Sequence, residues 1–128
     1  MLESSPIMKV QLVRELRFEA AHRLPLVPAG HRCHGLHGHS YRVELEVTGE
    51  VDPQAGWLVD FARIDEACEP LVARLDHSCL NDVAGLANPT SENLCAWLWR
   101  ELRPVLPALT AVTVHETVDS RCTYRGEE

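Results

Sequence analysis

The 128-residue sequence predicts an α+β fold, in which a four-stranded antiparallel sheet carries two helices on one face. Three observations predict it: two segments of alternating apolar and polar residues come first, two segments of helical periodicity follow, and two short alternating segments end the chain. Separate runs of strands and of helices are typical of α+β domains. The length suits one domain over residues 1–128, with residues 1–7 as a loose tail.

The first strand is predicted to run from about residue 10 to residue 22. Its apolar residues share one parity: Val10, Leu12, Leu16, Phe18 and Ala20. Side chains two residues apart point to the same face of a strand, so His22 falls on this apolar face. Residues 23–36 follow as a long connection, because they contain two prolines and two glycines.

The second strand is predicted to begin at His37 and has the clearest alternation in the chain. His37 and His39 extend the face formed by four apolar residues, Tyr41, Val43, Leu45 and Val47. Residues 52–56, Asp-Pro-Gln-Ala-Gly, predict the turn that follows this strand.

Two helices are predicted in the middle of the chain. Asp60 is a suitable N-cap for the first, whose apolar residues repeat at helical spacing as far as Leu75. Pro70 is expected to kink or split this helix, because proline lacks a backbone N–H. The second helix is predicted to start at residues 88–91, Asn-Pro-Thr-Ser, and to end before Pro104.

The last two strands are predicted around Val112, Val114 and Val118, which share one parity, and over residues 122–125. Glu116 has the parity of these valines. A buried carboxylate is costly unless it is paired or hydrogen-bonded. Glu116 is therefore either a satisfied structural carboxylate or an anchor for a ligand that presents two N–H donors.

Composition excludes several classes of function. The formal net charge of −7 disfavours a nucleic-acid-binding protein, which needs clustered Lys and Arg. The sequence contains no apolar run long enough to predict a membrane span and no segment that resembles a signal peptide. Five cysteines without a C-x-x-C motif predict a cytoplasmic protein with reduced thiols.

A metal site is predicted from the histidines. Five of the seven lie between His22 and His39. His37 and His39 share one face of a strand, and the preceding strand is expected to place His22 beside them. Three imidazoles leave one position of a zinc ion open, as in catalytic sites. Zinc is favoured over iron because no carboxylate is expected nearby to complete a facial triad.

Proton-transfer candidates lie near these histidines and after the first helix. Cys33 precedes His37 by four residues, and a bound cation would favour its thiolate form. Cys33 is therefore a candidate proton acceptor, a fourth zinc ligand, or an idle loop thiol. Asp76 and His77 are adjacent, and such a pair is either catalytic or a simple complement to the helix end.

These motifs in combination resemble the 6-pyruvoyl-tetrahydropterin synthase superfamily, and in particular its bacterial carboxy-tetrahydropterin-forming branch. They are Phe-Glu-Ala-Ala-His-Arg-Leu at 18–24, Cys-x-x-x-His-Gly-His at 33–39, Leu-Asp-His at 75–77, Asn-Pro-Thr-Ser-Glu at 88–92 and Glu-Thr at 116–117. The resemblance extends from about residue 10 to residue 126. The three-residue gap between Cys33 and His37 is similar to the bacterial carboxy type.

The resemblance implies a tunnelling fold, in which three sheets close into a barrel and two trimers stack as a hexamer. It implies an active site at a subunit interface and zinc bound by His22, His37 and His39. Cys33 would be the proton acceptor. Asp76 and His77 would form a proton relay contributed by a neighbouring subunit.

The same resemblance implies a pterin triphosphate as substrate. Glu116 would anchor the pterin ring, with Thr90 and Ser91 nearby. Arg23, Arg32 and Lys9 are candidate contacts of the triphosphate.

The implied reaction converts 7,8-dihydroneopterin triphosphate and water to 6-carboxy-tetrahydropterin, acetaldehyde and triphosphate, an early step of queuosine biosynthesis. Zinc would act as a Lewis acid on the side-chain hydroxyls. Two alternatives stay open: triphosphate elimination that keeps the three-carbon side chain, as in 6-pyruvoyl synthases, and a non-catalytic zinc-binding module.

Overall fold

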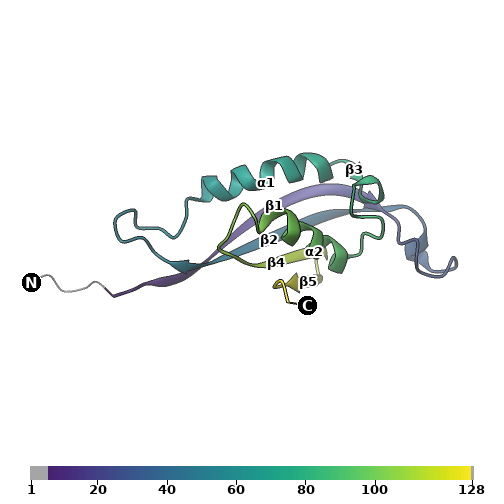
Figure 1. The fold of residues 1–128 in the computed structure, drawn as a ribbon. Helices are drawn as coiled ribbons and strands as arrows, with labels where there is room; N and C mark the ends of the chain where they lie inside the picture. Colours follow the sequence, from purple (N-terminus) through teal and green to yellow (C-terminus); the bar gives the residue numbers. More distant parts are fainter. Residues whose placement is uncertain (1–5, 128) are drawn as a thin grey trace, which may run out of the picture.

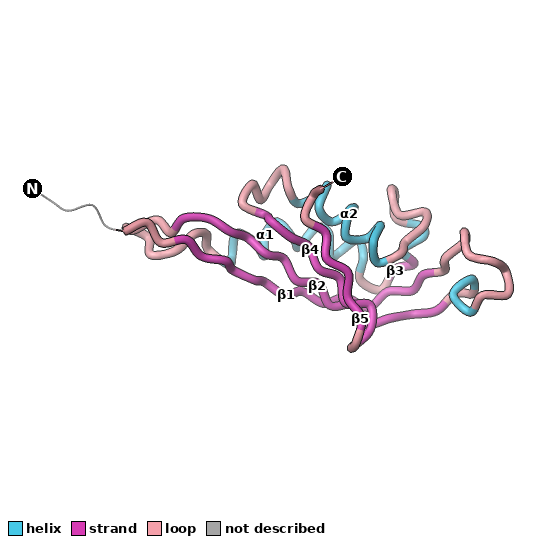
Figure 2. The backbone as a smooth tube through the Cα atoms, turned by 90° about the horizontal axis from the view of Figure 1, so that it is seen from below, coloured by secondary structure: helices cyan, strands magenta, loops and turns pink. Residues whose placement is uncertain are grey.

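The computed structural model describes residues 6–127 as a long, twisted sheet with two helices against one face (Figure 1). The strand order in the sheet is β3-β1-β2-β4-β5. Figure 2 shows both helices on the same side of the strands. The main elements are β1 (Lys9–His22), β2 (His37–Glu50), α1 (Phe61–Leu75), β3 (Ser78–Cys79), α2 (Ser91–Leu102), β4 (Leu109–Thr117) and β5 (Ser120–Tyr124).

The predicted α+β class, with both helices on one face of the sheet, is confirmed. The sheet has one strand more than predicted, because the two-residue strand β3 pairs in parallel with Ala20 and Ala21 of β1. Two residues are too few to produce a recognisable alternation in the sequence. The predicted tail falls outside the described residues as far as residue 5, and Pro6 and Ile7 carry no regular secondary structure.

Strands β1 and β2 form a continuous antiparallel pair along their whole length. The register runs from Lys9 opposite Glu50 to His22 opposite His37, and it places Ala20 opposite His39. Residues that face each other in an antiparallel pair lie on the same face of the sheet. The register therefore brings His22, His37 and His39 to one end and one face.

Helix α1 begins where the sequence predicts. The side chain of Asp60 accepts a hydrogen bond of 3.0 Å from the N–H of Ala62. The helix runs through Pro70 without being split, contrary to one of the two outcomes expected for that residue. Pro70 and Glu66 are both exposed, so water can reach the Glu66 carbonyl that lacks a proline N–H to accept.

Helix α2 is capped by Thr90, whose hydroxyl accepts a hydrogen bond of 3.1 Å from the N–H of Asn93. Its apolar face and that of α1 cover the centre of the sheet, where the aliphatic side chains of β2 and β4 are fully buried.

Neither helix is both long and apolar enough to cross a membrane, within the described residues.

Strand β4 ends earlier than predicted. Val118 lies in the turn to β5 and is 99% exposed, so its expected place on the inner face of the strand was wrong. The pairing of β4 with β5 contains an irregularity: Val114 faces Cys122 and Thr117 faces Ser120. Two residues of β4, His115 and Glu116, thus lie opposite one residue of β5, which is the arrangement of a β-bulge.

Leu45 lies at the centre of β2 and has no exposed surface. We expect Leu45→Ala to lower the free energy of unfolding by about 2–5 kcal/mol, because the change leaves a cavity in a core that cannot fully collapse. Urea denaturation followed by circular dichroism measures it. Leu26→Ala is the control, since Leu26 is 78% exposed and its loss should change stability by less than about 0.5 kcal/mol. Equal effects of both changes would contradict the assignment of the core.

Candidate metal centre and active site

Three histidine side chains converge at the end of the β1–β2 pair. The Nε2 atoms of His22 and His37 are 3.1 Å apart, and one ring nitrogen from each of the three residues lies within 4.8 Å of the other two. The three rings stand edge to face, with centroids 4.6–5.0 Å apart. The predicted neighbourhood of His22, His37 and His39 is thus present in a single chain.

Backbone carbonyls fix the orientation of two of these rings. Nδ1 of His22 lies 2.8 Å from the carbonyl oxygen of Pro89, and Nδ1 of His37 lies 2.8 Å from that of Gly35. A carbonyl oxygen only accepts hydrogen bonds, so each Nδ1 carries the proton and each Nε2 presents a lone pair. Metal-binding histidines are typically held in this way.

The ring of His39 also has a nitrogen that is available to bind a metal. Nε2 of His39 is buried and has no hydrogen-bond partner among the described residues. Burial lowers the pKa of His39 below its usual value, against the opposing effect of the nearby Glu116 carboxylate. The neutral form is the one that binds metals. The three imidazoles therefore form a donor set that fits a divalent cation.

Tyr41 packs beneath the histidines and is a residue that sequence reasoning missed. Its hydroxyl lies 3.2 Å from Nδ1 of His22, and its ring is stacked on Phe18 with centroids 5.0 Å apart. Burial raises the pKa of Tyr41, which keeps the phenol protonated. The available signal was its parity, since Tyr41 follows His37 and His39 on the same strand face.

Strand β4 brings a carboxylate to the same place. Oε1 of Glu116 lies 3.5 Å from Nε2 of His22 and 3.9 Å from Nε2 of His39, and the side chain is 28% exposed. The sequence argument for zinc assumed that no carboxylate lies near the histidines. That assumption was wrong, because Glu116 is distant in sequence and is delivered by sheet pairing.

Asp76 and His77 are fixed against β1. Oδ1 of Asp76 accepts a 2.9 Å hydrogen bond from the N–H of Glu19, and Oδ2 lies 3.0 Å from Nδ1 of His77. The first of these contacts, and then the second, lowers the pKa of Asp76. His77 has a φ of +57°, which a non-glycine residue rarely adopts, and its side chain is 80% exposed. Such strain is often found at functional sites.

Cys33 lies in a single 3-10 turn, η1 (Arg32–His34), of the loop between β1 and β2. Its carbonyl accepts a 2.9 Å hydrogen bond from the N–H of Leu24, and its N–H donates to Nδ1 of His31. Among the described residues, no hydrogen bond joins Cys33 to Asp76 or His77. A single chain therefore leaves these candidate groups as separate units.

The candidate substrate contacts are scattered around the histidines. Thr90 and Ser91 are half-buried and follow Pro89, whose carbonyl contacts His22. Arg23 and Arg32 are exposed in the loop between the histidine-bearing strands. Lys9 lies at the opposite end of β1, about 40 Å along the strand from His22, and so does not join the site in the same chain.

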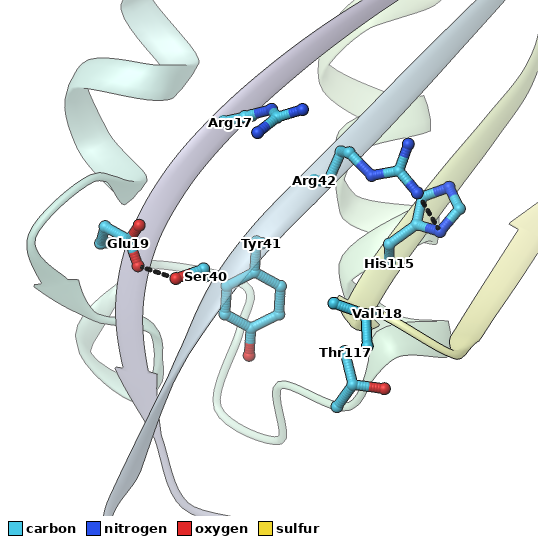
Figure 3. Close-up of a pocket in the computed structure, with 8 residues that line it drawn as sticks. All are labelled: Arg17, Glu19, Ser40, Tyr41, Arg42, His115, Thr117 and Val118. Carbon is cyan, nitrogen blue, oxygen red and sulfur yellow. Dashed lines mark hydrogen bonds between the residues drawn. The ribbon is translucent and has the colours of Figure 1, made fainter.

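A polar pocket of about 440 Å³ lies beside the site, mainly on the face of the sheet away from the helices (Figure 3). Arg42 approaches Nδ1 of His115 at 3.2 Å there, and Ser40 donates to Glu19. Carboxylates balance the arginine, since Glu15 and Glu44 lie 3.4 and 3.6 Å from its guanidinium. The sequence analysis assigned no role to these residues, because polar residues that alternate along a strand are typical of a face exposed to water.

Residues 11–127 match the family model described as 6-pyruvoyl tetrahydropterin synthase. The chain belongs to this family. The resemblance predicted from the motifs is thereby confirmed, and so is the tunnelling fold of the subunit.

Relatives in the family carry different names. The 6-carboxy-5,6,7,8-tetrahydropterin synthase of Synechocystis sp. is 38% identical over 119 residues, which cover 88% of this chain and 91% of that protein. The dihydroneopterin monophosphate aldolase of Pyrococcus furiosus is 32% identical over 100 residues, 78% of this chain and 81% of the aldolase. The structure of Caenorhabditis elegans 6-pyruvoyl tetrahydropterin synthase superposes with a TM-score of 0.83 at 30% identity, covering 98% of this chain and all of that one.

The three-histidine donor set predicts tight binding of one divalent cation per chain. We expect His39→Ala to weaken Zn²⁺ binding by more than about 100-fold, because changes to groups behind the ligands alone cost about 10–100-fold. Competition with a chromophoric chelator measures it. His31→Ala is the control, since His31 is exposed in the loop and outside the cluster. If both variants bind Zn²⁺ like the unaltered protein, the cluster is not the metal site.

Proposed function

We propose that the protein is a zinc-dependent lyase that converts 7,8-dihydroneopterin triphosphate and water to 6-carboxy-tetrahydropterin, acetaldehyde and triphosphate. The proposal rests on one observation: ring nitrogens of His22, His37 and His39 converge beside the Glu116 carboxylate. The membership of the chain in this family supports it. The name of the Synechocystis relative supports this reaction within the family. The product would enter queuosine biosynthesis in the cytoplasm, where thiols such as Cys33 stay reduced.

His22, His37 and His39 would hold the zinc ion. When bound, zinc would act as a Lewis acid toward hydroxyl groups of the substrate side chain. The Pro89 and Gly35 carbonyls keep two of the rings in the required tautomer. Glu116 would accept two N–H donors of the pterin ring, and Thr90 and Ser91 at the start of α2 would border that ring.

Proton transfer would be the task of Cys33 and of the Asp76–His77 pair. Asp76 faces Nδ1 of His77 at 3.0 Å and so favours the tautomer with a free Nε2. Cys33 would accept a proton from a substrate carbon, and His77 would exchange protons with a substrate oxygen. The exposed His77 side chain suits a role toward a neighbouring subunit rather than its own chain.

A homohexamer, built as a dimer of trimers, would bring these groups together. Two edges of the sheet support this proposal. Among the described residues, strand β3 pairs only with Ala20 and Ala21, so most of the outer edge of β1 is unpaired there, and β5 ends the sheet on the other side. Open edges with unpaired backbone groups favour pairing with another chain. Arg23 and Arg32, exposed beside the histidine strands, would contact the triphosphate.

A 6-pyruvoyl-type elimination is the second candidate function, and the match to the C. elegans structure favours it. It releases triphosphate but keeps the three-carbon side chain. A non-catalytic zinc module is the third, but it gives no role to the Asp76–His77 pair, in which His77 is held in a strained conformation.

Product analysis distinguishes the three candidates. We expect the purified, zinc-loaded protein to release acetaldehyde and triphosphate in equal amounts from 7,8-dihydroneopterin triphosphate. An alcohol dehydrogenase assay for acetaldehyde and mass spectrometry of the pterin measure this. Triphosphate release without acetaldehyde would favour the 6-pyruvoyl type, and no reaction would favour the binding module.

Replacement of Cys33 tests its role. We expect Cys33→Ala to retain one zinc per chain and to lose turnover by roughly 10²–10⁴-fold, the usual contribution of a positioned acid or base. Zinc content by atomic absorption and acetaldehyde release are measured on the same preparation. Cys79→Ala is the matched control, since Cys79 is also a free thiol but lies in β3, outside the loop that carries Cys33. Loss of zinc from Cys33→Ala would instead identify Cys33 as a ligand.

A further inference from the structure

Glu116 lies near two of the three histidines at distances close to those between ligands of one metal ion. Four ligands at about 2.0–2.1 Å from a tetrahedral zinc ion lie about 3.3–3.4 Å from one another. The Nε2 atoms of His22 and His37 are 3.1 Å apart, and Oε1 of Glu116 lies 3.5 Å from Nε2 of His22 and 3.9 Å from Nε2 of His39. Among the described residues, no contact of 4.0 Å or less joins the carboxylate to His37. Glu116 therefore lies beside the histidine cluster, nearest to His22, and would have to move closer to His37 and His39 to complete a tetrahedron.

The backbone around Glu116 explains how its carboxylate reaches this position. Glu116 belongs to the β-bulge of β4, and bulges re-aim side chains near active sites. The pairing of β4 with β2 ends one residue earlier, at His115 opposite Arg42. Glu116 therefore lies beyond the pairing with β2 and beside an irregular pairing with β5, so regular pairing does not fix the direction of its side chain.

The carboxylate also lacks any other partner. Among residues 6–127, its only polar side-chain contacts are with the two histidines, and neither is a hydrogen bond. A carboxylate that is 28% exposed has lost part of its hydration, and Glu116 gains no hydrogen bond in return among the described residues. A cation between the histidines would supply that compensation when no pterin is bound.

We propose that Glu116 occupies the fourth coordination position of the metal in the resting protein and leaves it for the pterin ring when the substrate binds. The inference rests on the proposed function, since it uses both the metal and the pterin-anchoring role of Glu116. It adds that Glu116 fills the fourth coordination position before the substrate arrives. On this proposal, Glu116 would leave the metal as a substrate hydroxyl binds, and its carboxylate would accept N–H donors of the pterin ring of the same molecule.

The test compares Glu116→Gln with Glu44→Gln. Glu44 lies on the opposite face of the sheet, beside His115, and so controls for the loss of a carboxylate from this fold. We expect Glu116→Gln to bind Zn²⁺ about 10–100-fold more weakly in chelator competition, and Glu44→Gln to bind it within about 2-fold of the unaltered protein.

A neutral probe separates ligation from simple charge attraction. Imidazole is titrated into the Co²⁺-loaded proteins and followed by visible absorption. If Glu116 blocks the fourth position, imidazole binds about 10-fold more tightly to Glu116→Gln than to the unaltered protein or to Glu44→Gln. Equal imidazole affinities would overturn the inference, because a carboxylate acting only through its charge does not compete with an uncharged ligand.

Two further measurements keep the result unambiguous. Glu116→Asp retains the charge but withdraws the carboxylate by one methylene, so it should bind imidazole about as tightly as is expected of Glu116→Gln. It also provides the comparison if Glu116→Gln fails to fold. Neopterin added to the unaltered Co²⁺ protein should change its absorption as the carboxylate leaves. Zinc-dependent turnover with equal imidazole affinities would reject only this inference. Absence of stoichiometric metal binding would reject the proposed function as well.

Discussion

The continuous register between β1 and β2 is the constraint on which the site depends. Fourteen consecutive residue pairs fix the position of His22 relative to His37 and His39. A slip of one residue would send His22 to the opposite face, where Arg17 and Arg42 lie, and would expose the apolar residues of the strand. The burial of Phe18, Tyr41, Val43 and Leu45 therefore enforces the register, so that core formation and assembly of the histidine cluster are one event.

Three side chains at this end of the sheet are positioned by a backbone atom as well as by packing. The Pro89 carbonyl orients His22, the Gly35 carbonyl orients His37, and the N–H of Glu19 holds Asp76. Glu19 lies in β1, and Gly35 and Pro89 lie two residues before β2 and α2, so these contacts orient the side chains without a ligand. Such preorganisation lowers the cost of assembling a binding site.

Much of this architecture could be predicted from the sequence, because it rests on local periodicity. The alternation of β1 and β2, the Asp60 cap and the parity of His37 and His39 are all short-range signals. The proximity of Glu116 to His22 was not predictable, since it depends on the pairing of β2 with β4 and on a bulge. Continuation of the helix through Pro70 was not predictable, because it depends on whether solvent can reach the unpaired carbonyl. The parity of Val118 predicted a longer strand, but the turn to β5 ends β4 at Thr117.

The hydrogen bond from His22 to Pro89 connects the cluster to the beginning of α2. Thr90, the next residue, caps that helix, so fraying of its first turn would also release the ring of His22. Helix ends open locally with a lower free energy than the whole molecule. A cation bound by the histidines would therefore be coupled thermodynamically to this helix terminus. It would protect the first amides of α2 from hydrogen exchange, and destabilising that turn would accelerate its loss.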